Sequence, residues 1–271
     1  MNSLYRVIEI SKQSLHQRLT RQLGVEQLSE QLLTRIREVR QDNPKMSSRM
    51  MYNLILPQHV GRDKFEAFCF EKGFKVEVKR SFHRTTNSLG VTRFDNLASR
   101  RKVTGINQIW ASDITYYRIR EKFYYLTFIM DLHSRFIVGY SVSKDLSTER
   151  TTLPALKMAI NSRKDLEGLV IHSDGGGQYY CKEWLHLTRL HKMKNSMCEN
   201  VYENAHAERL NGIIKNDYLI PYGVDDYNAL VTKTKKVIRV YNYQRPHQSI
   251  GKISPSQFEG RLKTIKGGLC G

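Results

Sequence analysis

The spacing of apolar residues predicts helices in the first part of the chain. From residue 25 to residue 39, apolar side chains recur at every third or fourth position, as they do on one face of a helix. Ser11 is suited to cap the helix that follows the segment LYRVIEI, and Asp-Asn-Pro at 42–44 should end the pattern. The predicted apolar stripe consists of Val25, Leu28, Leu32, Ile36 and Val39.

Two shorter helices are predicted after this stripe, over 47–55 and 61–74. Pro57 separates them, and Gly73 is expected to end the second. Short helices with a basic face are typical of helix-turn-helix modules that bind DNA. A plain helical bundle is the alternative interpretation.

A basic linker is predicted between two domains. The apolar periodicity disappears at residue 79, and basic and polar residues dominate from there to residue 104. We therefore expect a helical DNA-binding region over 1–78, a linker over 79–104 that follows a phosphate backbone, and a second domain over 105–271.

The second domain begins with strands. Aromatic and β-branched residues dominate three runs, 109–119, 123–132 and 135–142, and the short turns between them predict an antiparallel meander. Helical and strand patterns then alternate, with Ser147 and Thr148 as candidate caps of the first helix. The helices are expected over 147–162, 181–192, 203–219 and 225–242, and the strands over 169–175 and 194–198. This order predicts an α/β fold with a mixed five-stranded sheet flanked by helices.

The net charge points to a polyanionic partner. The chain carries 44 Lys and Arg against 26 Asp and Glu, a formal charge of +18, and residues 1–104 contribute +10 of it. Nucleic acid is the commonest polyanion in a cell. A basic charge without a specific partner, binding to ribosomal RNA and binding to an anionic membrane are the alternatives, and the membrane alternative is weak. The longest uncharged apolar stretch is too short to cross a bilayer, so no membrane partner is expected.

Cysteine spacing and loop motifs exclude other cofactors. The four cysteines lie far apart without a C-x-x-C pair, which fits a reducing cytosol and predicts no zinc. No phosphate-binding loop of the Gly-x-x-x-x-Gly-Lys type occurs, so ATP is not expected.

Three carboxylates are candidates for a metal site. Asp113 lies centrally in the first strand, Asp174 ends a short apolar strand and precedes three glycines, and Glu208 lies on a helix. Lys215, seven residues after Glu208, should return to the same helix face, opposite an apolar stripe. Hard divalent cations prefer oxygen ligands, so a shared ion is possible. An ordinary polar turn after the strand and a solvated helix face are the alternatives.

Other polar residues have simpler interpretations. Asp131 is expected to serve the turn after the second strand, and His172 to lie in the core or behind the metal ligands. His186 and His191 are five residues apart, which is not a metal-ligand spacing.

Several blocks of the sequence resemble one known family. WASDITYY, HSDGGGQYY and NAHAERLNGIIKNDYL resemble the three signature blocks of retroviral-integrase-type DDE transposases. Within that group the chain most resembles the second-reading-frame product of the insertion-sequence-three family. YNYQRPHQSIGKISPSQF resembles the closing block of that family, and DNPKMSSRMMYNLI its accessory helix-turn-helix.

The resemblance implies a ribonuclease-H-like core and a metal-binding triad of Asp113, Asp174 and Glu208. It implies two Mg²⁺ (or Mn²⁺) ions per active site. Between Asp174 and Glu208 lie 33 residues, two fewer than the usual family pattern, and Glu203 and Glu199 are the alternatives for the third ligand. A loop can lose two residues without moving the helix that follows it, so Glu208 is preferred.

The function implied is that of a DNA transposase. It would nick the inverted-repeat ends of a bacterial insertion sequence, transfer strands and integrate into target DNA, as a homodimer or larger synaptic oligomer on the bacterial nucleoid in the cytoplasm. A DNA-binding regulator without catalysis, or a nuclease without strand transfer, are the alternatives. The candidate DNA-contact residues are Lys215, Asn204, Gln178, Tyr179, Lys233, Lys235, Lys236 and Arg239.

Overall fold

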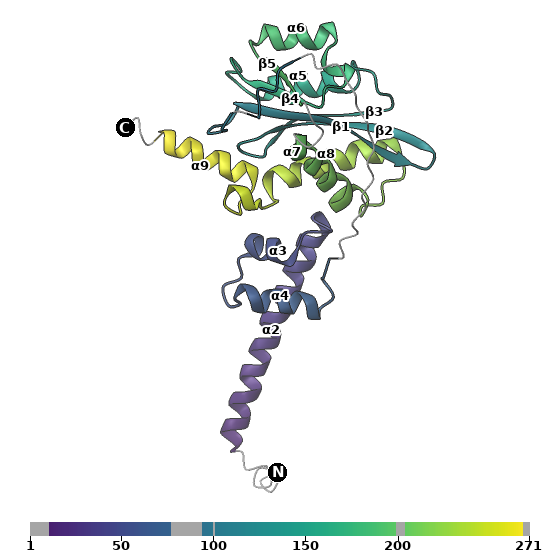
Figure 1. Cartoon of the computed structure of the whole chain (residues 1–271). Coiled ribbons are helices and arrows are strands. Elements are labelled where there is room, and N and C mark those ends of the chain that lie inside the picture. Colours follow the sequence, from purple (N-terminus) through teal and green to yellow (C-terminus); the bar gives the residue numbers. More distant parts are fainter. Residues whose placement is uncertain (1–10, 77–93, 100, 199–203, 268–271) are drawn as a thin grey trace.

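A five-stranded mixed sheet forms the centre of the computed structural model, which describes residues 11–76, 94–99, 101–198 and 204–267 (Figure 1). The strand order is β3-β2-β1-β4-β5. The first three strands form the predicted antiparallel meander, and the last two run parallel to β1. The strands are β1 (Ile109–Ile119), β2 (Lys122–Asp131), β3 (Ile137–Ser143), β4 (Val170–Ser173) and β5 (Lys194–Met197). The α/β prediction is confirmed.

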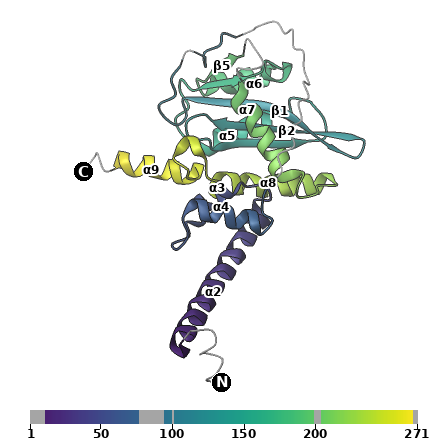
Figure 2. The ribbon, with the colours of Figure 1, turned by 60° about the horizontal axis from the view of Figure 1, so that its bottom comes forward.

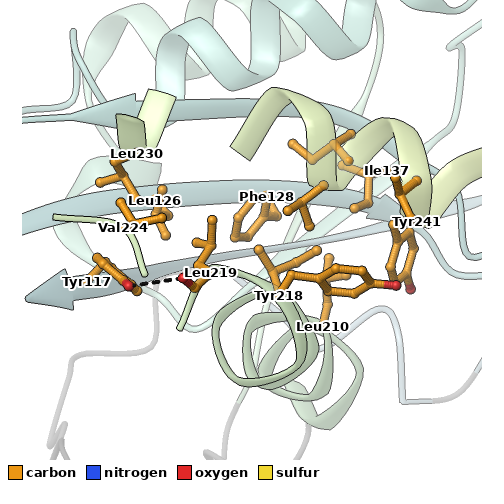
Figure 3. Close-up of a cluster of buried hydrophobic side chains, with 14 of the residues drawn as sticks. Tyr117, Leu126, Phe128, Ile137, Leu210, Tyr218, Leu219, Val224, Leu230 and Tyr241 are labelled. Atoms are coloured by element: carbon orange, nitrogen blue, oxygen red, sulfur yellow. Dashed lines mark hydrogen bonds between the residues drawn. The ribbon is translucent and has the colours of Figure 1, made fainter. Parts of the chain in front are cut away.

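Helices cover both faces of this sheet (Figure 1). One face packs against α5 (Thr152–Ser162) and α6 (Lys182–Leu190), around buried Trp110, Leu156 and Trp184. The other face packs against the second helical group, shown in Figure 3 with its buried side chains. That group consists of α7 (Ala205–Gly212), η3 (Ile213–Leu219) and α8 (Tyr227–Tyr243). Short 3-10 turns η1 (Gly177–Tyr179) and η4 (Gln248–Ile250) and helix α9 (Pro255–Gly267) complete the domain.

The cap predicted for α5 is wrong. The helix begins at Thr152, five residues later than expected, and its N-cap Thr151 makes no side-chain cap hydrogen bond. Ser147 instead belongs to a turn around Asp145, whose Oδ1 accepts its hydroxyl at 2.6 Å. The side chain of Ser147 is therefore already used when the helix starts.

The helix predicted over 203–219 changes its winding. Residues 205–212 are α-helical, and Ile213–Leu219 form a π-helix that continues the same axis. Tyr218 and Leu219 from this segment are buried against the sheet, and the hydroxyl of Tyr117 donates to the Leu219 carbonyl at 3.3 Å (Figure 3). A π-helix has more residues per turn, so residues beyond Gly212 do not keep the azimuth that 100° per residue predicts.

The N-terminal helices form a small cluster of their own. Ser11 caps α2 (Lys12–Asp42) as predicted, and α3 (Ser48–Ile55) and α4 (Arg62–Glu71) confirm the two short helices. Their core consists of Ile36, Met46, Met51, Phe65 and Cys69. The predicted stripe is buried only in its second half, because Val25 is 62% exposed and Leu28 47%. The segment LYRVIEI lies outside the described residues.

The end of α2 touches the helices beneath the sheet (Figures 1 and 2). The Tyr218 hydroxyl donates to Asn43 Oδ1 at 2.9 Å, and the Tyr222 hydroxyl donates to the Asp42 carbonyl at 2.7 Å. Most of the predicted linker lies outside the described residues, but Leu97 NH donates to Ser196 Oγ on β5 at 2.9 Å. No described helix is long and apolar enough to cross a membrane.

Candidate active site

The candidate site lies where two parallel strands separate. β1 pairs with β4 only from Ile109 to Ala111, opposite Val170 to His172. Two residues beyond the last pair, β1 carries Asp113 and the end of β4 leads into Asp174. The two carboxylates therefore stand on opposite sides of the gap that opens between the strands.

Asp113 is a half-buried carboxylate surrounded by negative charge. Burial is the main cause that raises its pKa to about 7, and the charge of Asp174 is the second. Glu208 also raises the pKa, whereas Lys215 lowers it. The carboxylates of Asp174 and Glu208 are therefore each within electrostatic reach of Asp113.

Asp113 is held by two neighbours. Its Oδ1 accepts Ile114 NH at 2.9 Å, and its Oδ2 accepts Asn211 Nδ2 at 2.6 Å. Asn211 lies on α7, three residues after Glu208, so one helix supplies both a contact to Asp113 and the third carboxylate. The remaining amide oxygen of Asn211 is buried and has no hydrogen-bond partner among the described residues.

The glycines after Asp174 allow tight packing around it. Gly175 has φ +82°, and a Cβ there would meet Met197 Cε and lie 2.7 Å from the Tyr180 hydroxyl. The Tyr180 hydroxyl donates to the Gly175 carbonyl, and Gly176 NH donates to Asp174 Oδ1 at 3.1 Å. Gly175 therefore allows the tight turn that holds the exposed Asp174 at the end of a buried strand. A residue with a Cβ at position 175 could not adopt this turn without displacing its neighbours.

Side chains of the site cover the backbone edge that β1 exposes beyond Ala111. Asn204 Nδ2 donates to the Ser112 carbonyl at 3.2 Å, and Lys215 Nζ donates to the Tyr116 carbonyl at 3.4 Å. Lys215 is half-buried; burial lowers its pKa and Asp113 raises it. Glu208 is exposed on α7. The π-helix has not removed Lys215 from the site, since its charge still reaches Asp113.

The donor set suits a hard divalent cation. Three carboxylates that repel one another in a partly buried site favour a bound cation, and Mg²⁺ and Mn²⁺ prefer oxygen ligands. In this structure, however, no three described His, Cys, Asp or Glu side chains are close enough to hold one ion together. The oxygen donors therefore suit such an ion chemically, although the three predicted ligands do not form a closed coordination shell in this structure.

Two of the predicted DNA-contact residues are buried and form hydrogen bonds within the protein. Tyr179 is 2% exposed, its hydroxyl lies 3.0 Å from Ser112 Oγ, and its ring stacks edge-on against Trp184. Asn204 is 3% exposed and holds the β1 edge. In this structure their polar atoms are used inside the protein, and contact with DNA stays a prediction for both residues.

The other DNA-contact candidates are more accessible. Gln178 Nε2 donates to the Leu146 carbonyl at 3.2 Å beside the site. On α8, Lys235 and Arg239 are exposed, whereas Lys236 pairs with Asp42 at 2.6 Å. Lys233 Nζ lies 5.3 Å from the centre of the Tyr222 ring.

The simpler interpretations of the remaining polar residues are confirmed. Asp131 is fully buried and its Oδ1 accepts His133 NH and Ser134 NH, so it shapes the turn after β2. His172 is buried, with Nδ1 3.0 Å from Ser196 Oγ. Sequence reasoning missed Asn211; its position three residues after Glu208 is the one signal that pointed to this face.

Comparison with known proteins identifies the family. The integrase core domain family matches residues 104–201, and a second integrase core domain family matches residues 191–255. The chain is 33% identical over 204 residues to the insertion element IS600 uncharacterized 31 kDa protein of Shigella sonnei, covering 73% of this chain and 75% of that protein. It is 30% identical over 195 residues to transposase InsF for insertion sequence IS3A of Escherichia coli, covering 70% and 67%.

A solved structure supports the fold. The simian T-cell lymphotropic virus intasome, in complex with a PP2A regulatory subunit, matches with a TM-score of 0.50 and 19% identity over 74% of this chain and 67% of that chain. At this identity the likeness concerns the fold alone. Together with the family matches, it confirms the ribonuclease-H-like architecture. The chain belongs to the IS3 family of DDE transposases, polynucleotidyl transferases of a fold that depends on divalent metal ions.

Proposed function

We propose that this transposase nicks the ends of a bacterial insertion sequence and joins them to target DNA at a site formed by Asp113, Asp174 and Glu208. The observation that carries the proposal is the end of the pairing between β1 and β4. Asp113 and Asp174 each lie two residues beyond the last paired residues, so they face each other where the strands separate. In nicking, the oxygen of a water attacks phosphorus and the 3′ oxygen leaves. In joining, the freed 3′-hydroxyl oxygen attacks a phosphorus of another strand, a new phosphodiester bond forms, and the 3′ oxygen of the attacked strand leaves.

Two Mg²⁺ (or Mn²⁺) ions are the proposed cofactors. When bound, such ions activate an attacking oxygen and neutralise the leaving oxygen at phosphorus. Asp113 and Asp174 would hold them across the gap. Glu208 is the proposed third ligand because its charge reaches Asp113 and because its helix already contacts Asp113 through Asn211.

The neighbouring residues orient these carboxylates. Asn211 fixes one oxygen of Asp113, and the backbone NH of Gly176 fixes one oxygen of Asp174. Lys215 supplies positive charge beside Asp113 and is the proposed contact to the phosphate of the DNA end.

The surrounding cations and helices would hold the rest of the DNA. We propose phosphate contacts for Lys233, Lys235, Lys236 and Arg239 on α8 and a contact for Gln178 beside the site. The helical region 1–78 would bind the inverted repeats, and the linker 79–104 would follow the phosphate backbone. Two ends must meet for joining, so a dimer or larger synaptic oligomer is proposed, working on the nucleoid in the bacterial cytoplasm.

Substitution of Asp174 tests the proposal. Asp174→Asn removes the charge and keeps the shape, so nicking and joining of labelled end DNA with Mg²⁺ should fall to background while binding in a gel shift remains. The matched control is Asp165→Asn: Asp165 is exposed, and its φ of +57° is one that Asn also adopts. Asp165→Asn should keep full activity. Persistent nicking by Asp174→Asn, or equal loss of binding and chemistry, would contradict the proposed role.

A further inference from the structure

The end of the β1–β2 hairpin exposes two aromatic rings. The hairpin runs past the rest of the sheet (Figures 1 and 2), since β3 pairs with β2 only from Tyr125 onward and β4 pairs with β1 only up to Ala111. Tyr116 is 41% exposed and Phe123 is 48% exposed. Their ring centres lie 5.3 Å apart in an edge-to-face arrangement, which forms one aromatic surface from two strands.

Cations flank this aromatic surface. Lys215 Nζ lies 5.1 Å from the centre of the Tyr116 ring, and the Arg118 guanidinium lies 5.9 Å from the centre of the Phe123 ring. Arg118 also pairs with Glu121 at 2.8 Å, so the charge near Phe123 is partly balanced. Exposed rings with basic side chains around them are typical of surfaces that hold single-stranded nucleic acid.

Lys215 links the aromatic surface to the active site. Its ammonium donates to the Tyr116 carbonyl at 3.4 Å and also acts on the charge of Asp113. Tyr116 follows Asp113 by three residues on one strand, a separation of roughly 10 Å. The two side chains leave β1 on opposite faces of the sheet, so DNA held at Asp113 would reach the ring of Tyr116 across the β1 edge that β4 leaves unpaired, where Lys215 lies.

We propose that Tyr116 and Phe123 form a stacking site for unpaired bases of the DNA end, next to the active site. The inference rests on the proposed function, because it takes the DNA at Asp113 as its starting point. The formal charge of +18 and the position of Lys215 favour a polyanion over an apolar protein segment as the occupant. Every base has a flat π-face, so such a site would accept unpaired bases with little regard to sequence and would not accept paired ones.

A binding experiment without metal tests this site separately from the chemistry. The probes are a short labelled duplex with a few unpaired nucleotides at one end and its blunt-ended counterpart, measured by fluorescence anisotropy with a chelator present. The wild-type chain should prefer the unpaired end. The double variant Tyr116→Leu, Phe123→Leu keeps apolar side chains and loses both rings, so that preference should fall on the order of tenfold.

The control is Tyr243→Leu. Tyr243 is exposed and belongs to another edge-to-face pair, with Phe136, whose position before β3 places it at the opposite end of the strands. This variant should keep the preference for unpaired ends. Thermal unfolding of each variant checks the fold, and the two single substitutions, each with a partial loss, replace the double variant if it does not fold.

A base analogue reports stacking directly. 2-Aminopurine in the unpaired segment should be quenched by the wild-type chain and not by the ring-free variants. Equal affinity of the wild type for both probes, or unchanged preference and quenching in the variants, would overturn the inference. If Asp174→Asn fails its own test while the preference and quenching hold, the assignment of the metal ligands is wrong and the stacking site stands.

Discussion

Two buried ionisable residues have neighbours of opposite charge, negative around one and positive around the other. Asp113 is crowded by other carboxylates, whereas His247 is crowded by guanidinium groups. The His247 ring lies 4.7 Å from that of Tyr241, and its Nε2 is buried without a hydrogen-bond partner among the described residues. Burial, followed by the charge of Arg245, lowers the pKa of His247 to about 3. Arg135 and Arg209 act in the same direction.

This lowered pKa predicts an acid-sensitive fold. The unfolded chain takes up a proton at His247 near its ordinary pKa of about 6.5, whereas the folded chain does so only near 3. The free energy of unfolding should therefore fall as the pH drops through this window, by at most about 1.4 kcal/mol per pH unit from this residue. Urea unfolding at several pH values measures the slope.

His247→Gln should make that slope shallower. The control, His186→Gln, removes a histidine from an exposed position and should leave the slope as it is in the wild type. If the His247→Gln chain loses stability with acid as steeply as the wild type, His247 is not held neutral.

The sequence anticipated part of the site at this scale. Asp113 and Asp174 were proposed as ligands mainly because their sequence blocks resemble those of the family; a carboxylate in or after an apolar strand made the site possible without deciding it. Tyr179 and Asn204 are buried, since a polar side chain that is near a predicted ligand in sequence can point inward as well as toward the ligand. Only the three-dimensional pairing of Asn204 with the Ser112 carbonyl distinguishes the two cases.

Packing between elements is close where Gly139 of β3 meets α5. A Cβ on Gly139 would meet the Ala155 carbonyl oxygen and lie 2.9 Å from Ala159 Cβ. Both obstacles belong to a buried helix, and one is backbone. Gly139→Ala should therefore lower the free energy of unfolding by about 1–3 kcal/mol, measured by denaturant unfolding.

Gly260→Ala is the matched control. Gly260 lies in α9, and no atom lies within 4 Å of the methyl group that alanine would add, so the substitution should raise stability by about 0.5–1 kcal/mol. Equal effects of the two substitutions would show that α5 can move away from β3.

Most elements could be predicted from periodicity, and the exceptions have physical causes. The meander followed from aromatic and β-branched runs, because side-chain alternation is a local property. The π-helix at Ile213–Leu219 could not, since a change of winding depends on what the segment packs against. The exposed first half of α2 carries the same apolar spacing as its buried half, and the sequence alone does not say which half finds a partner.

At the scale of the whole molecule, positive charge gathers on α8 next to the contact with α2. Lys236 is paired with Asp42, whereas no ion pair of Lys235 or Arg239 occurs among the described residues. A cation that contacts a phosphate adds about 0.9 to the slope of log affinity against log salt. Lys235→Ala combined with Arg239→Ala should thus reduce the slope for duplex DNA by about 2, measured by anisotropy over a salt series.

Lys236→Ala provides the comparison, because Asp42 competes with the proposed phosphate contact for the Lys236 ammonium. It should change the slope by less than about 1. If all three cations contribute equally, DNA displaces Asp42 from Lys236. If none contributes, α8 does not face the DNA.

Helix α9 contributes to the interior of the catalytic domain, and this determines where the domain ends. Glu259 on α9 forms two short bonds to Arg163, at 2.7 and 2.8 Å, and accepts Ser134 Oγ at 2.6 Å, all largely shielded from solvent. The second integrase core match stops at residue 255. A truncation at that boundary would strand Arg163 as a lone interior cation, at a cost of about 3–5 kcal/mol. The smallest part of the chain that folds stably should therefore include α9 and extend beyond residue 255, where the family match ends.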